Sequence, residues 1–365
     1  MKFFKFFLIF LLLWGVVIDE VKGYEPSFEF YPEKIEPFEV FPEELIRNLP
    51  SDIDSQVAYF LNYFSNEKKE VIQRWLKRGE RFLLYFKMIY REYGLPEDLV
   101  YLALIESGCN PFAVSKAGAV GIWQFIEGTA KLYNLKIDYW IDERKDFIKS
   151  THASAKYLKK LYELFGDWRV AVASYNAGEG RLNRALKAKN YMDYWKVMTS
   201  GVLPYETVAY LPQWLAITLI AKNPTKYGFQ PLKEIPLDFE EIKVPGGVDL
   251  KVFALAGGID YEELFLLNAE LRRSITPPDT FYTLKVPYGT KSLIEKNFYK
   301  IPTITLVKQT PLGTYRIITL ASESQENPFQ LNSKESSSNS KGVLKSSKKI
   351  SKKKSLLTSK KKRKK

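Results

Sequence analysis

The feature that most constrains this chain is a stretch of about 170 residues in which apolar side chains recur at helical spacing. From Asp52 to about Lys222, glycine and proline interrupt this pattern at intervals, and almost no segment alternates like a half-buried strand. The stretch therefore predicts an all-α domain. Its expected helices lie near residues 52–65, 67–77, 80–93, 96–107, 126–134, 143–165, 167–175, 179–188 and 205–221.

The pattern changes after Lys222, where prolines at four positions between residues 224 and 245 break the helical spacing. A small α+β module is expected to follow. Its predicted elements are helices at 249–256 and 261–268, a closing strand at 282–287, and two further strands within 301–320.

The N-terminus resembles an export signal. Met1–Ile18 begins with lysines and continues as an uncharged apolar run, and small residues allow cleavage before Tyr24. The run is shorter than the ~20 residues that span a bilayer, which favours a cleaved signal at 1–23 over a permanent anchor. Residues 24–50 are rich in proline and predict a linker. We therefore expect export to the periplasm or cell envelope, with membrane association if the segment is kept.

The positive charge of the chain belongs to its C-terminal tail. Residues 334–365 contain 14 Lys or Arg and one Glu, so they account for the whole net charge of +13. Residues 322–365 predict disorder because they contain too few apolar groups to offset the entropy of ordering. Such a tail can bind an anionic envelope surface, bind nucleic acid or stay solvated. The export signal argues against nucleic acid as a partner.

Glu106 is the first candidate for chemistry. The helix that contains it is expected to end at Gly108, so Glu106 falls in the last turn, near the negative end of the helix dipole. Apolar neighbours and that dipole both disfavour the ionised carboxylate and raise its expected pKa. Glu106 is thus a candidate general acid, and the alternative is a partly exposed acid without a special role.

Three more short motifs lie at the ends of predicted helices: Gly121–Phe125, Ser174–Gly178 and Pro204–Tyr210. Together with Glu106-Ser107, these motifs make the chain resemble the lysozyme-like SLT family of lytic transglycosylases. Within that family, the chain is most similar to the branch of membrane-bound murein transglycosylases of type D. The likeness runs from about Asp52 to Gln230. It implies a mainly α fold, with a lysozyme-like helical catalytic domain at residues 51–230.

The resemblance implies cleavage of the β-1,4 bond between N-acetylmuramic acid and N-acetylglucosamine in peptidoglycan glycan strands, with formation of 1,6-anhydromuramyl ends. A single Glu106 would act first as acid and then as base, while the C6 hydroxyl of the sugar closes on C1. Two alternatives stay open. One is a goose-type lysozyme-like hydrolase that delivers water to C1, and the other is a non-catalytic protein that binds cell-wall glycan.

The resemblance also assigns roles to the residues around Glu106. Ser107 would hold the region of Glu106 and contact substrate, and Trp123 would stack on a sugar face. The other expected contacts are hydrogen bonds from Gln124 and Asn176, and a lining formed by Tyr175 and Tyr210. Glu206 either compensates the dipole of its helix or supports the site.

The module at residues 240–290 resembles a degenerate LysM repeat. Its segment Leu267–Glu270 and its closing strand fit that repeat, whereas Gly247–Leu250 reads Gly-Val-Asp-Leu where the repeat has Gly-Asp-Thr-Leu. Glycan binding by the module is therefore a hypothesis.

The remaining candidates favour structural roles. His152 lies in an amphipathic helix with no partner in sequence, and Cys109, the one cysteine, is expected to pack as a small apolar side chain. Asp142 and Glu143 are predicted to cap the long helix near Arg144. No His/Cys cluster supports a metal, no cofactor is expected, and the oligomeric state is left open.

Overall fold

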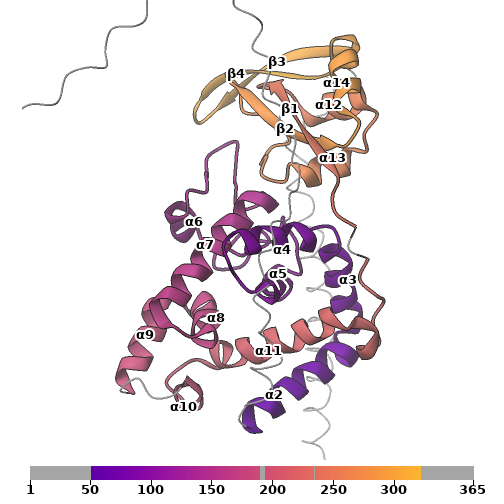
Figure 1. Cartoon of the computed structure of the whole chain (residues 1–365). Coiled ribbons are helices and arrows are strands. Elements are labelled where there is room, and N and C mark those ends of the chain that lie inside the picture. Colours follow the sequence, from indigo (N-terminus) through magenta and orange to yellow (C-terminus); the bar gives the residue numbers. More distant parts are fainter. Residues whose placement is uncertain (1–50, 190–193, 234, 322–365) are drawn as a thin grey trace, which may run out of the picture. The chain divides into compact units, whose positions relative to one another are not determined.

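A computed structural model describes residues 51–189, 194–233 and 235–321. The predicted signal, linker and basic tail lie outside these residues. Helices dominate the described chain up to Tyr227, which we call the helical domain (Figure 1). Its elements are α2 (Ser51–Asn62), η1 (Tyr63–Glu67), α3 (Lys69–Gly79), α4 (Leu83–Glu92), η2 (Glu97–Tyr101), α5 (Leu102–Ser107), α6 (Glu127–Leu132), α7 (Phe147–Phe165), α8 (Trp168–Ala177), α9 (Glu179–Ala188), α10 (Tyr194–Thr199), α11 (Tyr205–Lys222) and η3 (Pro224–Tyr227).

The core of the helical domain forms around α11. This helix is apolar on nearly every face, as expected of a helix that others cover on all sides. It packs against α2, α5 and α8, and its Trp214 and Leu215 are fully buried. The predicted all-α character of this part of the chain is confirmed. Within the described ranges, no helix combines the length and the apolar character that a bilayer-spanning segment needs.

Helix ends follow the local sequence in most places. Asp167 caps α8 by accepting a hydrogen bond from the backbone N–H of Arg169 at 2.8 Å, and Gly178 ends that helix, as predicted. The predicted start of the long helix is wrong. Asp146, not Asp142 or Glu143, is the N-cap of α7 and accepts hydrogen bonds from two backbone N–H groups of the first turn. Asp142 instead forms an ion pair with Arg144.

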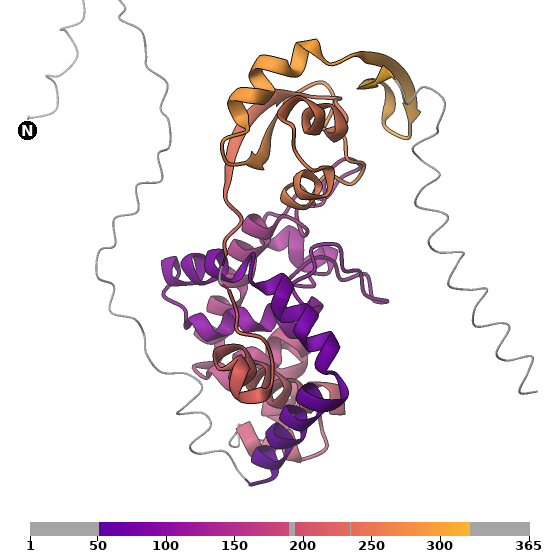
Figure 2. The same cartoon turned by 90° about the vertical axis from the view of Figure 1, so that its right-hand side faces the viewer.

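Residues 239–320 form a second set of elements, which we call the C-terminal module. They are β1 (Phe239–Pro245), α12 (Leu250–Gly257), α13 (Tyr261–Leu267), β2 (Phe281–Pro287), α14 (Lys291–Asn297), η4 (Phe298–Lys300), β3 (Thr303–Thr310) and β4 (Gly313–Leu320). Strands β1 and β2 pair antiparallel, with Ile242 opposite Leu284, and β3 pairs antiparallel with β4 (Figure 2). The predicted helices, closing strand and final strand pair are confirmed, whereas β1 and α14, like α10 of the helical domain, were not predicted.

One loop of the helical domain enters the core of the C-terminal module. Trp140 and Ile141 are buried in the module's apolar cluster, where they join Val248, Leu271 and Leu284. The ring of Trp140 also meets that of Tyr315 edge to face, with centroids 5.4 Å apart. The module's core is therefore completed by residues from another part of the chain.

Candidate active site

Glu106 lies in the last turn of α5, as predicted. The helix ends at Gly108, which adopts φ 60° and donates its N–H to the carbonyl of Leu104 at 2.7 Å. A Cβ at this position would lie 2.2 Å from the indole of Trp75, so only glycine fits. The tight helix end and the packing of Trp75 together fix the backbone that carries Glu106.

Burial raises the pKa of Glu106 to about 7. A hydrogen bond from Tyr210 acts in the opposite direction, and the negative charge of Glu206 adds a smaller upward shift. A carboxyl group with a pKa near 7 can release and recover a proton at neutral pH, which is what a group that serves as both acid and base requires.

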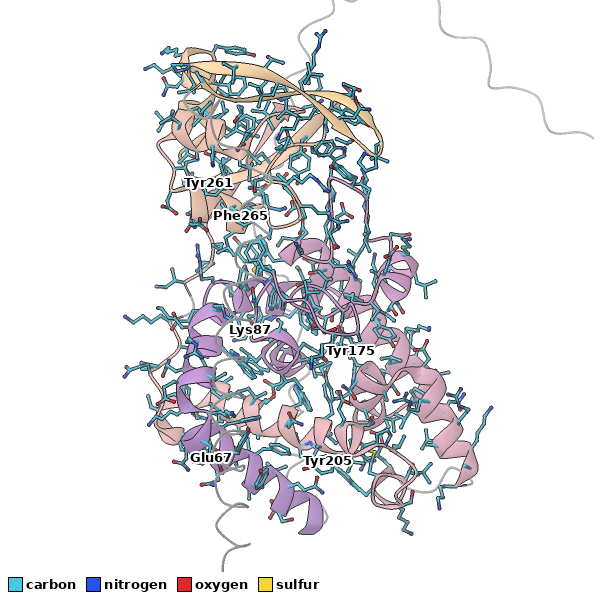
Figure 3. The ribbon with its side chains drawn as sticks, turned by 180° about the vertical axis from the view of Figure 1, so that it is seen from behind. Glu67, Lys87, Tyr175, Tyr205, Tyr261 and Phe265 are labelled. Atoms are coloured by element: carbon cyan, nitrogen blue, oxygen red, sulfur yellow. The ribbon has the colours of Figure 1, made fainter. Side chains whose placement is uncertain are left out.

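Two tyrosines from different helices meet at Glu106. The hydroxyl of Tyr210, on α11, donates a hydrogen bond to Oε1 of Glu106. Tyr175, on α8 and labelled in Figure 3, donates its hydroxyl proton to the backbone carbonyl of Trp123 at 2.9 Å. Burial and the nearby Glu106 hold the pKa values of both phenols well above their usual value, so both act as neutral hydrogen-bonding groups.

The loop at residues 118–125, which we call the site loop, is tied to the end of α5. The Ser107 hydroxyl donates to the carbonyl of Ile122 at 2.9 Å and accepts from the backbone N–H of Asn110 at 3.0 Å. Gln124 has φ 51°, and its side-chain nitrogen donates to the carbonyl of Gly121 at 2.8 Å. Because that acceptor is a carbonyl, the amide must present its NH2 to the loop, which leaves Oε1 to accept from a ligand.

Trp123 does not line an open surface. Its side chain is fully buried, its indole N–H donates to Oγ1 of Thr151 at 2.8 Å, and its ring stacks on Tyr90 at 5.5 Å. The prediction that this ring stacks on a sugar is therefore wrong, because the same apolar surface is used by the core. Trp123 contributes its backbone carbonyl to Tyr175 instead.

Asn176 and Glu206 lie at helix ends near this cluster. Asn176 is half-buried in the last turn of α8, directly after Tyr175. Glu206 is exposed in the first turn of α11, where it faces the positive end of the helix, and it also acts on Glu106 through its charge. The structure is thus consistent with both interpretations of Glu206.

Sequence analysis missed a row of buried hydroxyls on α7. Ser150, Thr151 and Ser154 are all fully buried. Thr151 holds the indole of Trp123, and Ser154 links the hydroxyls of Tyr90 and Tyr175 at 2.9 and 3.4 Å. Three small hydroxyl residues on one side of an amphipathic helix were the available signal, since buried hydroxyls need partners.

His152 and Cys109 have the structural roles that the sequence predicts for them. His152 has its Nδ1 3.1 Å from the Tyr93 hydroxyl, and burial lowers its pKa. Cys109 is fully buried, and burial raises the pKa of its thiol to about 12. Across the described ranges, no group of three or more His, Cys, Asp or Glu residues is arranged to hold a metal ion.

Comparisons with known families match two separate segments. Residues 84–198 match the Transglycosylase SLT domain, which contains Glu106, the site loop and Tyr175. Residues 238–302 match the LysM-like domain of lytic transglycosylase MltD, which begins at β1 and extends to η4.

Curated proteins similar to this chain include lytic murein transglycosylases. The chain is 33% identical over 203 residues to membrane-bound lytic murein transglycosylase D of Escherichia coli K12, which covers 54% of this chain and 44% of that protein. It is 30% identical over 118 residues to the soluble lytic murein transglycosylase of Salmonella typhimurium, covering 30% and 18%. The chain thus spans less than half the length of these relatives.

Among solved structures, the 70 kDa soluble lytic transglycosylase of Escherichia coli aligns with 53% of this chain and 33% of its own, at 23% identity and a TM-score of 0.34. The similarity of this chain to lytic transglycosylases rests on the sequence matches. Residues 84–198 are thus similar to transglycosylase SLT domains, and residues 238–302, which follow them, are similar to the LysM-like domain of MltD-type lytic transglycosylases.

Proposed function

We propose that this protein is a peptidoglycan lytic transglycosylase, which cleaves the β-1,4 bond between N-acetylmuramic acid and N-acetylglucosamine and leaves 1,6-anhydromuramyl ends. The observation that carries the proposal is the raised pKa of Glu106, together with the contacts that set it. Its pKa of about 7 and its hydrogen bond from Tyr210 suit a carboxyl group that acts alone in both proton transfers.

In the first step, Glu106 acts as the general acid. Because Tyr210 donates to Oε1, the acid proton of Glu106 is carried on Oε2. Transfer of that proton to the glycosidic oxygen breaks the bond to C1, and the N-acetyl group of the muramyl sugar helps to stabilise the developing positive charge.

In the second step, the Glu106 carboxylate acts as the base. It accepts the proton of the C6 hydroxyl, whose oxygen forms a new bond to C1 and closes the anhydro ring. Tyr210 favours the carboxylate during this interval, since its hydrogen bond lowers the pKa of Glu106. Glu106 ends protonated, so the cycle consumes no external proton and no water.

The other polar groups fit a neutral sugar substrate. Oε1 of Gln124 and the side chain of Asn176 would bind hydroxyl or acetamido groups, and Tyr175 and Tyr210 would line the reacting centre. Ser107 acts mainly by holding the site loop. We further propose an envelope location, glycan binding by the C-terminal module, and weak attraction of residues 322–365 to anionic envelope surfaces.

Mass analysis of digested sacculi tests the proposal, with wild type compared with Glu106→Gln. We expect anhydro-ended muropeptides from wild type and none from the variant. Glu127→Gln, an exposed carboxylate on α6, is the matched control and should keep full activity. Reducing ends alone would establish the goose-type hydrolase alternative. Glycan binding without cleavage by wild type would establish the non-catalytic alternative.

A further inference from the structure

The C-terminal module contacts the segment between α6 and α7. We call residues 138–146 the bridging loop. The backbone N–H of Asp142 donates to the carbonyl of Glu270 at 2.9 Å, and the N–H of Arg272 donates to the carbonyl of Trp140 at 2.9 Å. These main-chain bonds add the bridging loop to the module as a short antiparallel partner.

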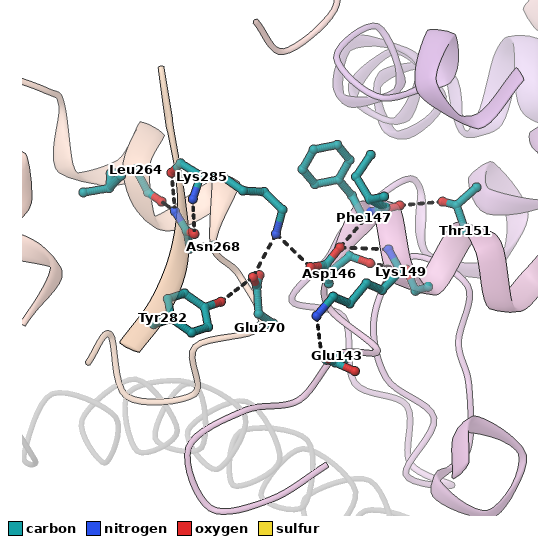
Figure 4. Close-up of polar contacts among 12 residues, drawn as sticks. Glu143, Asp146, Phe147, Lys149, Thr151, Leu264, Asn268, Glu270, Tyr282 and Lys285 are labelled. Atoms are coloured by element: carbon teal, nitrogen blue, oxygen red, sulfur yellow. Dashed lines mark hydrogen bonds and ion pairs between the residues drawn. The ribbon is translucent and has the colours of Figure 1, made fainter. Parts of the chain in front are cut away.

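A buried ionic network closes the same contact (Figure 4). Nζ of Lys285, on β2, lies 2.7 Å from Oδ2 of Asp146 and 2.9 Å from Oε1 of Glu270. The hydroxyl of Tyr282 donates to the same oxygen of Glu270 at 2.7 Å. All three charged side chains are less than 10% exposed. Because one cation holds two carboxylates from different parts of the chain, removing it would leave both without their nearest opposite charge in the interior.

The pKa values of this network follow from its geometry. Burial raises the pKa of Glu270 despite the nearby Lys285. Burial alone would do the same to Asp146, but Lys285 and the backbone N–H of Lys149 bring its pKa below the usual value. Asp146 is therefore the ionised partner of Lys285 while it caps α7.

The opposite side of the bridging loop supports the site loop. Arg144 is held by Asp142 through two hydrogen bonds, at 2.7 and 2.8 Å, and its Nη1 donates to the carbonyls of Gly118 and Phe125 at 3.2 and 3.3 Å. The two ends of the site loop are thereby joined by one guanidinium group. Gly121 lies directly against the Arg144 carbonyl.

A second contact, from α13, reaches the segment that precedes the site loop. The ring of Phe265, labelled in Figure 3, stacks on that of Phe112 with centroids 4.9 Å apart and an interplanar angle of 18°. One residue further along, the carbonyl of Ala113 accepts hydrogen bonds from the backbone N–H of Gly121 at 2.9 Å and from the side chain of Gln124 at 3.4 Å. The module therefore contacts both the bridging loop, which supports the site loop, and the segment at Phe112 and Ala113, which binds Gln124.

We infer that the C-terminal module is a fixed brace for the site loop, and that Lys285 is a positioning residue. It acts by holding Asp146 and Glu270, and the Glu270 carbonyl in turn binds the N–H of Asp142, the partner of Arg144. The module would hold the loop in its binding geometry in addition to any contact with glycan. The predicted effect on turnover rests on the proposed function, whereas the predicted effect on the loop does not.

Hydrogen exchange on the full-length protein tests the brace, and Lys285→Met is the main variant. We expect amide exchange in residues 118–125 and 138–146 to quicken at least about tenfold, while α2 and α11 stay protected. Lys243→Met is the matched control: this lysine is exposed on the paired strand β1, and its loss should change nothing in these segments. Unchanged exchange at 118–125, with faster exchange confined to the module, would overturn the inference.

A milder variant covers the case in which Lys285→Met does not fold. Arg272→Ala removes an exposed hydrogen bond of 2.7 Å from Nη1 of Arg272 to the carbonyl of Asp138. It leaves the buried ionic network intact. It should quicken exchange at 118–125 in the same direction by a smaller factor, and no change there would count against the brace. On glycan substrate, both variants should lower kcat, by about tenfold for Lys285→Met, with little change in KM. A wild type without activity would refute the proposed function alone, because the exchange result does not depend on turnover.

Discussion

The hydroxyl of Tyr210 donates a hydrogen bond to Oε1 of Glu106, across 104 positions of sequence. The carboxyl group comes from the end of a six-residue helix, and the phenol comes from the most deeply buried helix of the domain. This pairing makes the protonation of Glu106 a property of how α5 and α11 pack. Changes at either residue should therefore alter the pH dependence of activity as well as its rate.

Replacing Tyr210 by Phe should raise the pKa of Glu106 above about 7, because the hydrogen bond that favours the carboxylate is lost. We expect kcat to fall by about 10- to 100-fold and the alkaline limb of the kcat/KM profile to move to higher pH. Tyr205→Phe, at an exposed position on the first turn of the same helix, should leave both unchanged. An alkaline limb that stays in place in Tyr210→Phe would contradict the assignment.

Glu106 should also make stability depend on pH. Its pKa is about 7 in the folded protein and near 4.5 when exposed, so the folded state holds the proton more tightly between these values. Stability contributed by protonated Glu106 is complete below pH 4.5 and is lost as the pH rises to 7. Glu106→Gln lacks this loss and should gain up to about 3 kcal/mol relative to wild type above pH 7. Urea unfolding at pH 5 and pH 8 measures the difference, and an equal difference at both pH values would refute the predicted pKa.

Glu206→Gln separates a charge effect from a catalytic one. The negative charge of Glu206 raises the pKa of Glu106, so its removal should move the alkaline limb of the pH profile slightly downward. Because Glu206 is exposed, this shift should shrink in high salt, and kcat should stay within about threefold of wild type. A loss of several orders of magnitude would instead indicate a second catalytic carboxylate and an ordinary glycosidase pair.

Gly121→Ala should distort the site loop. A Cβ at Gly121 would lie 1.9 Å from the carbonyl oxygen of Arg144, at φ +85°. We expect a loss of about 3–5 kcal/mol in the free energy of unfolding, together with reduced activity. Gly118→Ala is the control, since Gly118 has φ +79° and no atom within 4 Å of a new Cβ, and it should cost only about 1–2 kcal/mol. Similar losses in the two variants would mean that strain, not contact with Arg144, limits the site loop.

Trp123→Phe tests the assignment of this side chain to the core. The change removes the hydrogen bond to Thr151 and some buried volume, so the unfolding free energy should fall by about 1–3 kcal/mol. KM for glycan should change less than twofold, because the ring has no exposed face. A large rise in KM without loss of stability would restore the sugar-stacking hypothesis.

Local signals were sufficient for much of the fold. The end of α5 at Gly108, the cap at Asp167 and the stop at Gly178 each depend on a few neighbouring residues, and each was predicted. Strand β1 was missed because three of the seven residues in its sequence, FEEIKVP, are charged and it follows a proline-rich segment. Its buried Ile242 and Val244 become a strand pattern only beside β2, some forty residues later.

The residues of the candidate site also divide into those that neighbouring residues predict and those that depend on distant parts of the chain. Glu106 was identified because the local sequence places this carboxylate in the last turn of a helix, where its charge is unfavourable. The burial of Trp123 could not be found, since an aromatic side chain has the same pattern in a core and on a binding face. Lys285 gave no signal either, because its partner Asp146 lies 139 positions away and a lysine within a strand normally predicts a solvent-facing side chain.

Cys109 gives the folded protein a practical advantage. As the one thiol of the sequence, fully buried and with its pKa raised to about 12, it is shielded from alkylating reagents until the helical domain opens. A fluorescent or spin label placed through a new cysteine at an exposed position, such as Leu132 on α6, would therefore be chemically unique in the native state. The rate at which the native Cys109 thiol reacts would separately report unfolding of the helical domain.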